Sequence, residues 1–202
     1  ASVNGISKLV YASTSGVYGH LALEQSVSEE IVVDPRTSYA MAKRYNEIYL
    51  ASLFEEKGIN SVALRFFNIY GLRQDNRMVI PRFIEQALAG DPLTVYGTGE
   101  QTRDFTYVDD AIKATVDLAS GVKGFEIYNI ANEKEATVLD LAQAIIDVTS
   151  SSSEIKLINA PSKRYDYEVG RRYGSSEKLK KKTGYKPTTE LDDGLRTILT
   201  QN

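Results

Sequence analysis

Two side chains four residues apart give the strongest chemical signal in the sequence. Tyr39 and Lys43 enclose the segment Tyr-Ala-Met-Ala-Lys. On a helix, positions i and i+4 share a face, so the phenol and the ammonium would point the same way. A phenol ionises near pH ~10, and a nearby cation favours its charged form. The pair is therefore a candidate tyrosine general base, and the alternative is an ordinary amphipathic pair.

Thr14 adds a second polar group to this pair. It follows the short apolar segment 8–12, Lys-Leu-Val-Tyr-Ala, which is typical of a buried strand. Open α/β sheets bind ligands at the carboxyl ends of their strands. A hydroxyl at this position can therefore hydrogen-bond the same substrate oxygen as the phenol.

The elements around these residues predict a parallel sheet. A helix is expected at 38–57, with Thr37 or Ser38 as its N-cap and Gly58 as its end, and a second buried strand at 61–67. Strand, helix and strand in this order form a βαβ unit. Further helices are expected at 80–89, 109–120, 138–149, 176–183 and 190–199, and further strands at 93–96, 127–130 and 155–158.

A glycine-rich phosphate-binding turn is missing from the sequence. Dinucleotide folds open with a strand that runs into such a turn, with an acidic residue ~20 positions later. Gly97 and Gly99 follow a strand, but an arginine-bearing segment comes next instead of a helix. A fully apolar first strand would also lack neighbours to cover it. We therefore interpret the chain as a piece of a larger protein.

The composition excludes several classes of protein. The 202 residues carry 24 basic and 27 acidic side chains, a net charge of −3, which favours neither nucleic acid nor an anionic membrane as a partner. No apolar run reaches the ~20 residues of a membrane span, and the first residues lack a signal pattern. Without cysteine and with one histidine, His20, no metal site is expected. A cytoplasmic protein is expected.

Five segments in fixed order carry a family resemblance. They are 12–19, 39–43, 65–71 (Arg-Phe-Phe-Asn-Ile-Tyr-Gly), 95–108 and 175–187. In these segments the chain resembles the NAD-dependent epimerase/dehydratase family, the extended short-chain dehydrogenase/reductases, and is most similar to its UDP-glucose 4-epimerases. The resemblance implies an α/β fold, with a partial Rossmann-like parallel sheet at 1–75 and a smaller mixed α/β substrate-binding domain at 76–202. Some segments of the second range are expected to return to the sheet.

The resemblance also implies roles for individual residues. Tyr39 would be the base, Thr14 its hydrogen-bonding partner, and Lys43 the tuning cation. Tyr39 and Lys43 would also contact the cofactor NAD, together with Ser13 and Phe67. The UDP-sugar substrate would be bound by Thr14, Asn68, Val79, Thr94, Val95, Tyr96, Arg103 and Arg164. Arg171 is an alternative to Arg164, because the Tyr165-Asp166 that follows lacks the family's glycine.

The two residues that follow Thr14 indicate which of the family's reactions to expect. Dehydratases of the family carry Asp-Glu there, and UDP-glucuronate decarboxylases carry Ser-Glu, whereas this chain has Ser15 and Gly16. Without a second acid/base group, the expected reaction is oxidation and re-reduction of one carbon. The expected function is thus C4 epimerisation of a UDP-hexose through a 4-keto intermediate.

Two other functions remain open at this point. One is an NAD(P)-dependent nucleotide-sugar reductase, which would share Thr14, Tyr39 and Lys43 but release its cofactor each cycle. The other is a truncated chain that binds a nucleotide sugar without catalysis, because the phosphate-binding turn is missing. We expect the 202 residues alone not to hold NAD, and we expect either a homodimer, by analogy through helix 38–57, or a need for the missing N-terminal part.

Overall fold

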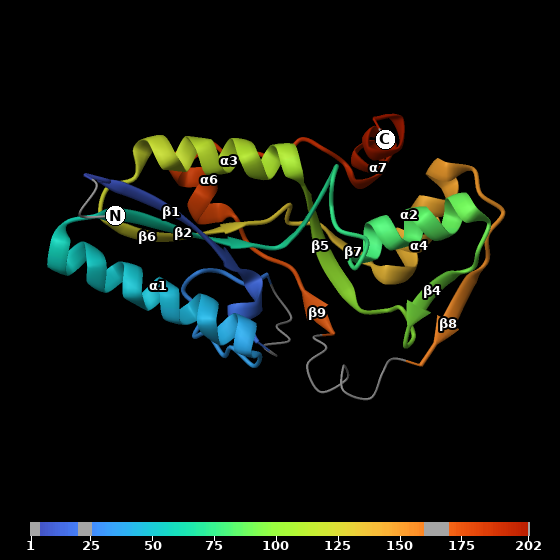
Figure 1. Ribbon diagram of the computed structural model, residues 1–202, viewed down its shortest axis with the longest axis horizontal. Coiled ribbons are helices and arrows are strands. Elements are labelled where there is room, and N and C mark those ends of the chain that lie inside the picture. Colours follow the sequence, from blue (N-terminus) through green and yellow to red (C-terminus); the bar gives the residue numbers. More distant parts are fainter. Residues whose placement is uncertain (1–4, 20–25, 160–169, 202) are drawn as a thin grey trace.

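The computed structural model describes residues 5–19, 26–159 and 170–201 (Figure 1). Its first sheet consists of three parallel strands in the order β1-β2-β6. The strand bounds are Lys8–Thr14 for β1, Asn60–Phe66 for β2 and Phe125–Ile130 for β6. Helix α1 (Ser38–Lys57) covers one face, and helices α3 (Val108–Gly121) and α6 (Glu177–Thr183) cover the other. The predicted α/β class is confirmed.

The βαβ unit forms where the sequence predicts it. Helix α1 has the predicted bounds, because Thr37 Oγ1 accepts a hydrogen bond of 3.1 Å from the Ala40 amide and Gly58 ends the helix with a left-handed φ of 65°. These are the capping interactions that helix ends require. In β2, Val62, Ala63 and Leu64 have no exposed surface, as expected for a strand covered on both faces.

The other strands of the described residues form two further sheets, of four and two strands. Strand β5 (Thr102–Tyr107) pairs with β3 (Asn68–Tyr70), β7 (Glu135–Thr137) and β9 (Arg171–Arg172). Strand β4 (Leu93–Tyr96) pairs with β8 (Ile155–Ile158) in parallel. Of these strands, sequence reasoning found β4 and β8 and missed β3, β5, β7 and β9.

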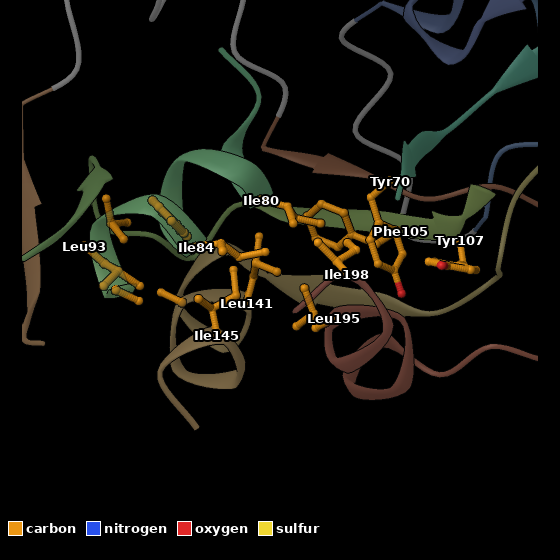
Figure 2. Packing of buried hydrophobic residues seen from close by; sticks show 14 residues of the cluster. Tyr70, Ile80, Ile84, Leu93, Phe105, Tyr107, Leu141, Ile145, Leu195 and Ile198 are labelled. Atoms are coloured by element: carbon orange, nitrogen blue, oxygen red, sulfur yellow. The ribbon is translucent and has the colours of Figure 1, made fainter. Parts of the chain in front are cut away.

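Helices α2 (Val79–Ala89), α4 (Val138–Thr149) and α7 (Leu191–Thr200) complete this part. Figure 2 shows their shared core, in which Ile80 and Ile84 face Leu141 and Ile145, while Leu195 packs toward the aromatic group around Tyr70. The ring of Tyr70 packs edge-on against Phe105 and Tyr107, with centroids 6.4 and 5.4 Å away. Helix α4 starts at the predicted capping box of Thr137 and Asp140.

The first sheet and the sheet around β5 are joined by a short connection. Strand β2 ends at Phe66, which lies in register with Thr14 of β1, and β3 begins at Asn68 in the other sheet. A single residue, Phe67, separates the two strands. Strand β6, from the second half of the sequence, is part of the first sheet, and helix α6 packs against β6. The division into domains at residue 75 stays a prediction.

Candidate functional site

Thr14 is the last residue of β1 and caps the short 3-10 helix η2 (Ser15–Tyr18). Its Oγ1 accepts a hydrogen bond of 3.1 Å from the amide of Gly16. Gly16 lies close to both neighbouring elements, because a Cβ there would be 3.3 Å from Thr14 Oγ1 and 3.7 Å from Ala40 Cβ. The end of β1 and the first turn of α1 are therefore in contact, which places the Thr14 hydroxyl near the start of the helix.

Tyr39 and Lys43 lie on α1 at this same end of β1. Lys43 Nζ donates a 2.7 Å hydrogen bond to the carbonyl oxygen of Ala12. It lies 5.5 Å from the centre of the Tyr39 ring and 5.0 Å from that of Tyr11. Tyr39 is 59% exposed. The structure thus brings the phenol, the ammonium and the Thr14 hydroxyl to the carboxyl end of one parallel strand.

Ser13 and Phe67, the other two residues expected to contact NAD, are interior. Ser13 is buried, and its Oγ donates a 2.6 Å hydrogen bond to Glu47 Oε1. The buried Phe67 ring packs against Gly174, where a Cβ would lie 2.4 Å from the ring. The cofactor role of both residues stays a prediction.

A buried polar network beneath α1 was not found from the sequence. The Arg65 guanidinium donates two hydrogen bonds to the Glu47 carboxylate, of 2.9 and 2.8 Å, and a third of 3.0 Å to the Tyr18 hydroxyl. Tyr18 in turn donates to Asn129 Oδ1 at 2.8 Å. One available signal was the position of Glu47, four residues after Lys43 and hence on the same side of the helix.

The network fixes the ionisation states of its members. Burial opposes ionisation of Glu47, but its hydrogen bonds and charge interaction with Arg65, assisted by Ser13 and Arg44, hold the pKa of this carboxyl below its usual value. Burial raises the pKa of Tyr18 to about 12, although Arg65 acts against this shift. A deprotonated Glu47 therefore faces a charged Arg65 inside the protein.

A cavity of about 850 Å³ opens between β3, β4, β5, β8 and α2. Four residues expected to bind the UDP-sugar line it, namely Asn68, Val79, Tyr96 and Arg103. Sequence reasoning missed Arg77, Arg82, Gln101 and Asn159, which line it as well. Among the described residues, three arginines and one carboxylate, that of Glu100, border the cavity. This part of its wall therefore carries positive charge in a chain whose net charge is −3.

Thr94 and Val95 lie beside the cavity without lining it. The side chain of Val95 is fully buried in the core between β4 and the helices. Thr94 is bound by side chains of α2: its amide donates to Gln86 Oε1 at 3.2 Å, its Oγ1 accepts from Gln86 Nε2 at 3.0 Å, and its carbonyl accepts from Arg82 at 3.3 Å. Their contact with the substrate stays a prediction.

The remaining sequence candidates have different positions. Arg164 and His20 lie outside the described residues. Arg171, the alternative to Arg164, lies on β9 and donates two hydrogen bonds of 2.7 and 2.6 Å to the Glu135 carboxylate. In the part of the chain that the structure describes, no cluster of three potential metal ligands occurs. No helix there is both long and apolar enough to cross a bilayer.

Asp104 holds strand β5 to the loop that follows β6. Its carboxylate has no exposed surface and accepts hydrogen bonds from the amides of Asn132 and Glu133, at 2.8 and 3.0 Å. Burial raises the pKa of Asp104 to about 6, although these amides favour the charged form. The residue next to Arg103 thus fixes the cavity wall to the first sheet.

The chain matches proteins of one family. Residues 1–131 match the model of the NAD dependent epimerase/dehydratase family. The chain is 37% identical to a UDP-N-acetyl-alpha-D-glucosaminuronate decarboxylase of Bacillus cytotoxicus, over 98% of this chain and 64% of that protein. The chain therefore spans about two thirds of the length of that relative.

Solved structures of nucleotide-sugar epimerases superpose closely on the chain. A UDP-glucose 4-epimerase of Thermotoga maritima with UDP-glucose superposes with a TM-score of 0.91 at 28% identity, covering 98% of this chain and 64% of the other. A UDP-glucuronic acid 4-epimerase of Bacillus cereus with UDP-glucuronic acid and NAD gives a TM-score of 0.86 at 32% identity, covering 96% and 62%. The resemblance inferred from the five segments is confirmed, and the chain belongs to the NAD-dependent epimerase/dehydratase family.

Proposed function

We propose that the protein containing this chain is an NAD-dependent enzyme that interconverts a UDP-hexose and its C4 epimer. The observation that supports this proposal is the position of Thr14 at the carboxyl end of β1, where Lys43 of the Tyr39–Lys43 pair bonds the Ala12 carbonyl, together with the absence of a second acid/base side chain at Ser15-Gly16. Oxidation of a hydroxyl to a 4-keto group needs one base, and re-reduction needs the same group as an acid.

The three side chains have separate tasks in this reaction. Tyr39, whose ring is exposed, takes the proton of the 4-hydroxyl. Lys43 lies 5.5 Å from the centre of that ring, where its positive charge stabilises the negative charge that develops on the phenol oxygen. Thr14 hydrogen-bonds the same substrate oxygen and so orients it toward the base.

NAD fits the exposed donors at this end of the sheet. Tyr39 and Lys43 supply a hydroxyl and an ammonium, which suit the hydroxyls of a ribose, and we assign the cofactor contacts of this chain to them first. When bound, NAD supplies the redox partner for oxidation and re-reduction of the sugar carbon. The protein's part is to hold the sugar so that C4 faces the cofactor and its hydroxyl faces Tyr39.

The positively charged cavity is the proposed site of the nucleoside diphosphate. Arginine suits diphosphate oxygens because its planar guanidinium donates paired, charge-assisted hydrogen bonds. Asn68 and Arg103 lie on neighbouring strands, since Asn68 pairs in register with Phe105, and both line the cavity. We assign the diphosphate to these two residues and the base to the end of the cavity formed by Val79 and Tyr96.

Decarboxylation of a UDP-uronic acid is the second candidate. Its support is the 37% identity to a UDP-sugar decarboxylase. Against it stands Gly16, which takes the place of an acidic residue and offers little room, because even a Cβ would lie 3.3 Å from Thr14 Oγ1. We therefore prefer epimerisation.

The deciding experiment uses the complete enzyme and NAD. It is incubated with UDP-glucose, UDP-galactose, their N-acetyl forms and UDP-glucuronate, and the products are separated by chromatography. An equilibrium mixture of C4 epimers from at least one pair supports the proposal. Release of carbon dioxide supports the decarboxylase instead, and a 4-keto-6-deoxy sugar contradicts both.

We also propose that the enzyme is cytoplasmic and acts as a homodimer. Helix α1 turns several large side chains outward, among them Met41, Tyr45, Ile48 and Tyr49, each more than half exposed. Such an apolar surface is suited to contact with a second copy. Sedimentation of the complete enzyme, compared with a Tyr45→Glu variant, tests this assignment.

A further inference from the structure

Tyr11 precedes Ala12, the residue whose carbonyl oxygen accepts the hydrogen bond from Lys43. Its side chain points toward α1, because its hydroxyl accepts a hydrogen bond of 2.9 Å from Asn46 Nδ2. Ser13, two residues further along β1, bonds to the same helix, as the alternation of side chains along a strand requires. Tyr11 therefore lies in the interface between the first sheet and α1.

The ammonium of Lys43 is held by one hydrogen bond and two aromatic rings. The bond goes to the carbonyl oxygen of Ala12, at 2.7 Å. Lys43 Nζ lies 5.0 Å from the centre of the Tyr11 ring and 5.5 Å from that of Tyr39, within the distance at which a ring face attracts a cation. A lysine carries three donors on a flexible four-carbon stem, so a single hydrogen bond does not fix the ammonium in every direction.

The nearest carboxylate along the helix is bound by other residues. Glu47 lies one helical turn beyond Lys43, but its carboxylate accepts hydrogen bonds from Arg65 and Arg44. Among the residues that the structure describes, no carboxylate forms an ion pair with Lys43. The negative face of an aromatic ring takes the place of a counterion here.

The two rings beside Lys43 differ in how firmly they are placed. Tyr39 is 59% exposed on α1 and carries the hydroxyl that we assign to the reaction, so its ring moves with the group that must be positioned. Tyr11 lies in β1 in register with Ala63 of β2, which has no exposed surface. Asn46 ties the hydroxyl of Tyr11 to α1. The Tyr11 ring is thus attached to the sheet and to the helix at once.

We propose that Tyr11 is a positioning residue for catalysis, whose ring face holds the ammonium of Lys43 beside the phenol of Tyr39. This inference rests on the proposed function. In that function the ammonium stabilises negative charge on the phenol oxygen, and this interaction weakens as the two groups move apart. A restraint on the ammonium therefore acts on the rate of proton removal and not on binding of the nucleotide sugar.

The test compares two replacements of Tyr11 in the complete enzyme. Tyr11→Leu removes the ring face, whereas Tyr11→Phe keeps it and removes only the hydroxyl that Asn46 binds. Tyr11→Leu is expected to lower kcat about two- to thirtyfold, the equilibrium factor that a cation–ring contact supplies. The rise of kcat with pH should also move to higher pH, because the phenolate is less stabilised, while KM for the nucleotide sugar stays nearly unchanged. Tyr11→Phe should retain most of kcat and the wild-type pH profile.

Tyr128→Leu is the matched control. Lys178 Nζ lies 4.8 Å from the centre of the Tyr128 ring, and this ring packs on the face of the sheet that α3 and α6 cover. The variant therefore loses the same kind of contact away from the proposed base. It should lower the urea midpoint of unfolding and keep the wild-type pH profile of kcat. If Tyr11→Leu does not fold, Tyr11→Met, which fills more of the space of the ring, gives the same comparison.

The outcomes separate this inference from the proposed function. Equal losses of kcat in Tyr11→Leu and Tyr11→Phe would assign the effect to the hydrogen bond with Asn46 and overturn the inference. A loss of kcat in Tyr11→Leu without a change in the pH profile would indicate a loosened fold, and an unchanged kcat would show no role at all. Either result would also overturn the inference, while the proposed function stands. A wild-type enzyme that forms no C4 epimer from any UDP-hexose would overturn both.

Discussion

Glu47 and Arg65 form a two-pronged ion pair inside the protein, between the helix that carries Tyr39 and Lys43 and the strand that leads to Asn68. The two hydrogen bonds measure 2.9 and 2.8 Å, and the side chains are 0% and 2% exposed. Such a pair has a defined geometry because both partners are planar and bidentate. It therefore sets where α1 lies on the sheet.

Replacing Glu47 by Gln is expected to destabilise the chain strongly, because Arg65 would keep its charge in the interior without a counterion. Breaking a buried pair in this way typically costs about 3–5 kcal/mol of unfolding free energy. Urea unfolding of the 202-residue chain measures the change. Asp75→Asn removes a carboxylate from the exposed pair with Arg77 and should have little effect on the free energy of unfolding. Equal stability of both variants would show that the buried pair does not anchor α1.

Tyr39→Phe in the complete enzyme is expected to lower kcat by about 10²–10⁴-fold, the usual contribution of a general acid–base group. Binding of the nucleotide sugar should be nearly unchanged, because only one hydroxyl is removed. Tyr45→Phe, an exposed tyrosine on the same helix, is the matched control. Near-normal turnover of Tyr39→Phe would mean that Tyr39 is an ordinary residue of the helix surface.

Arg103→Ala is expected to weaken binding of free UDP as well as of UDP-sugars. A hydrogen bond to a charged group is worth roughly 1.5–3 kcal/mol, or about ten- to a hundredfold in affinity. Calorimetric titration of the 202-residue chain measures this loss, with Arg196→Ala on α7 as control. The loss should be the same for UDP and CDP, because both carry the diphosphate. Unchanged affinity would remove Arg103 from the site.

Asp104 is expected to make stability depend on pH in the unusual direction for an acid. Burial raises its pKa from 3.8 to about 6, so the folded state retains the proton at pH values where the unfolded state has released it. The stability that this proton contributes is fully present below about pH 4 and is lost as the pH rises through 6. At about 1.4 kcal/mol per pKa unit, the loss is roughly 3 kcal/mol.

The variant Asp104→Asn tests this sign. The unfolding free energy of the wild type minus that of the variant should fall by about that amount between pH 3 and 7. Glu135→Gln is the opposite control, because its hydrogen bond with Arg171 lowers the pKa of Glu135 and the corresponding difference should rise with pH. A difference for Asp104→Asn that stays constant over this range would contradict the prediction.

Glu133 adopts a left-handed backbone conformation, with φ of 61°, and its carboxylate accepts hydrogen bonds from the Ser176 amide and from Lys180. Glu133→Ala loses these bonds and keeps the strain, whereas Glu133→Gly loses the bonds and relieves the strain. The glycine variant is expected to be more stable than the alanine variant by about 1 kcal/mol. At Lys181, within α6, the alanine variant should instead be more stable than the glycine variant, because alanine is favoured inside a helix. Urea unfolding of the four variants tests both orders.

Local patterns were sufficient for the elements whose signals are local. The apolar run before Thr14, the cap at Thr37 and the end at Gly58 predicted the βαβ unit correctly, and Thr137 with Asp140 predicted the start of α4. The expected burial of the run was wrong, because residues 8–12 of β1 are exposed or partly exposed. Strand β5 escaped prediction because its buried positions include Asp104 and Thr106. The Asp104 carboxylate accepts hydrogen bonds from the amides of Asn132 and Glu133, which are distant in the sequence, and from the Thr106 hydroxyl on the same strand.

The site shows the same division. Spacing on one helix predicted that Tyr39 and Lys43 share a face, and the structure confirms that they do. The block Thr94–Tyr96 was assigned to the substrate as a unit, whereas strand alternation turns Val95 into the core and leaves Tyr96 at the cavity. Arg82 gave no sequence signal because an arginine on an amphipathic helix normally faces solvent. Its position depends on the distant pairing of β4 with β8.

The single residue between β2 and β3, Phe67, fixes the distance between two parts of the proposed substrate site. Strand β2, before Phe67, belongs to the sheet that positions the proposed base. Strand β3, after it, begins with Asn68, which we assign to the diphosphate. The Phe67 ring is buried and packs closely against Gly174. One inserted residue would displace Asn68 by about 3.3 Å relative to the proposed base and turn the side chains of β3 to the opposite face. In the proposed function, the distance between the reacting carbon and the diphosphate is therefore set by this single-residue connection.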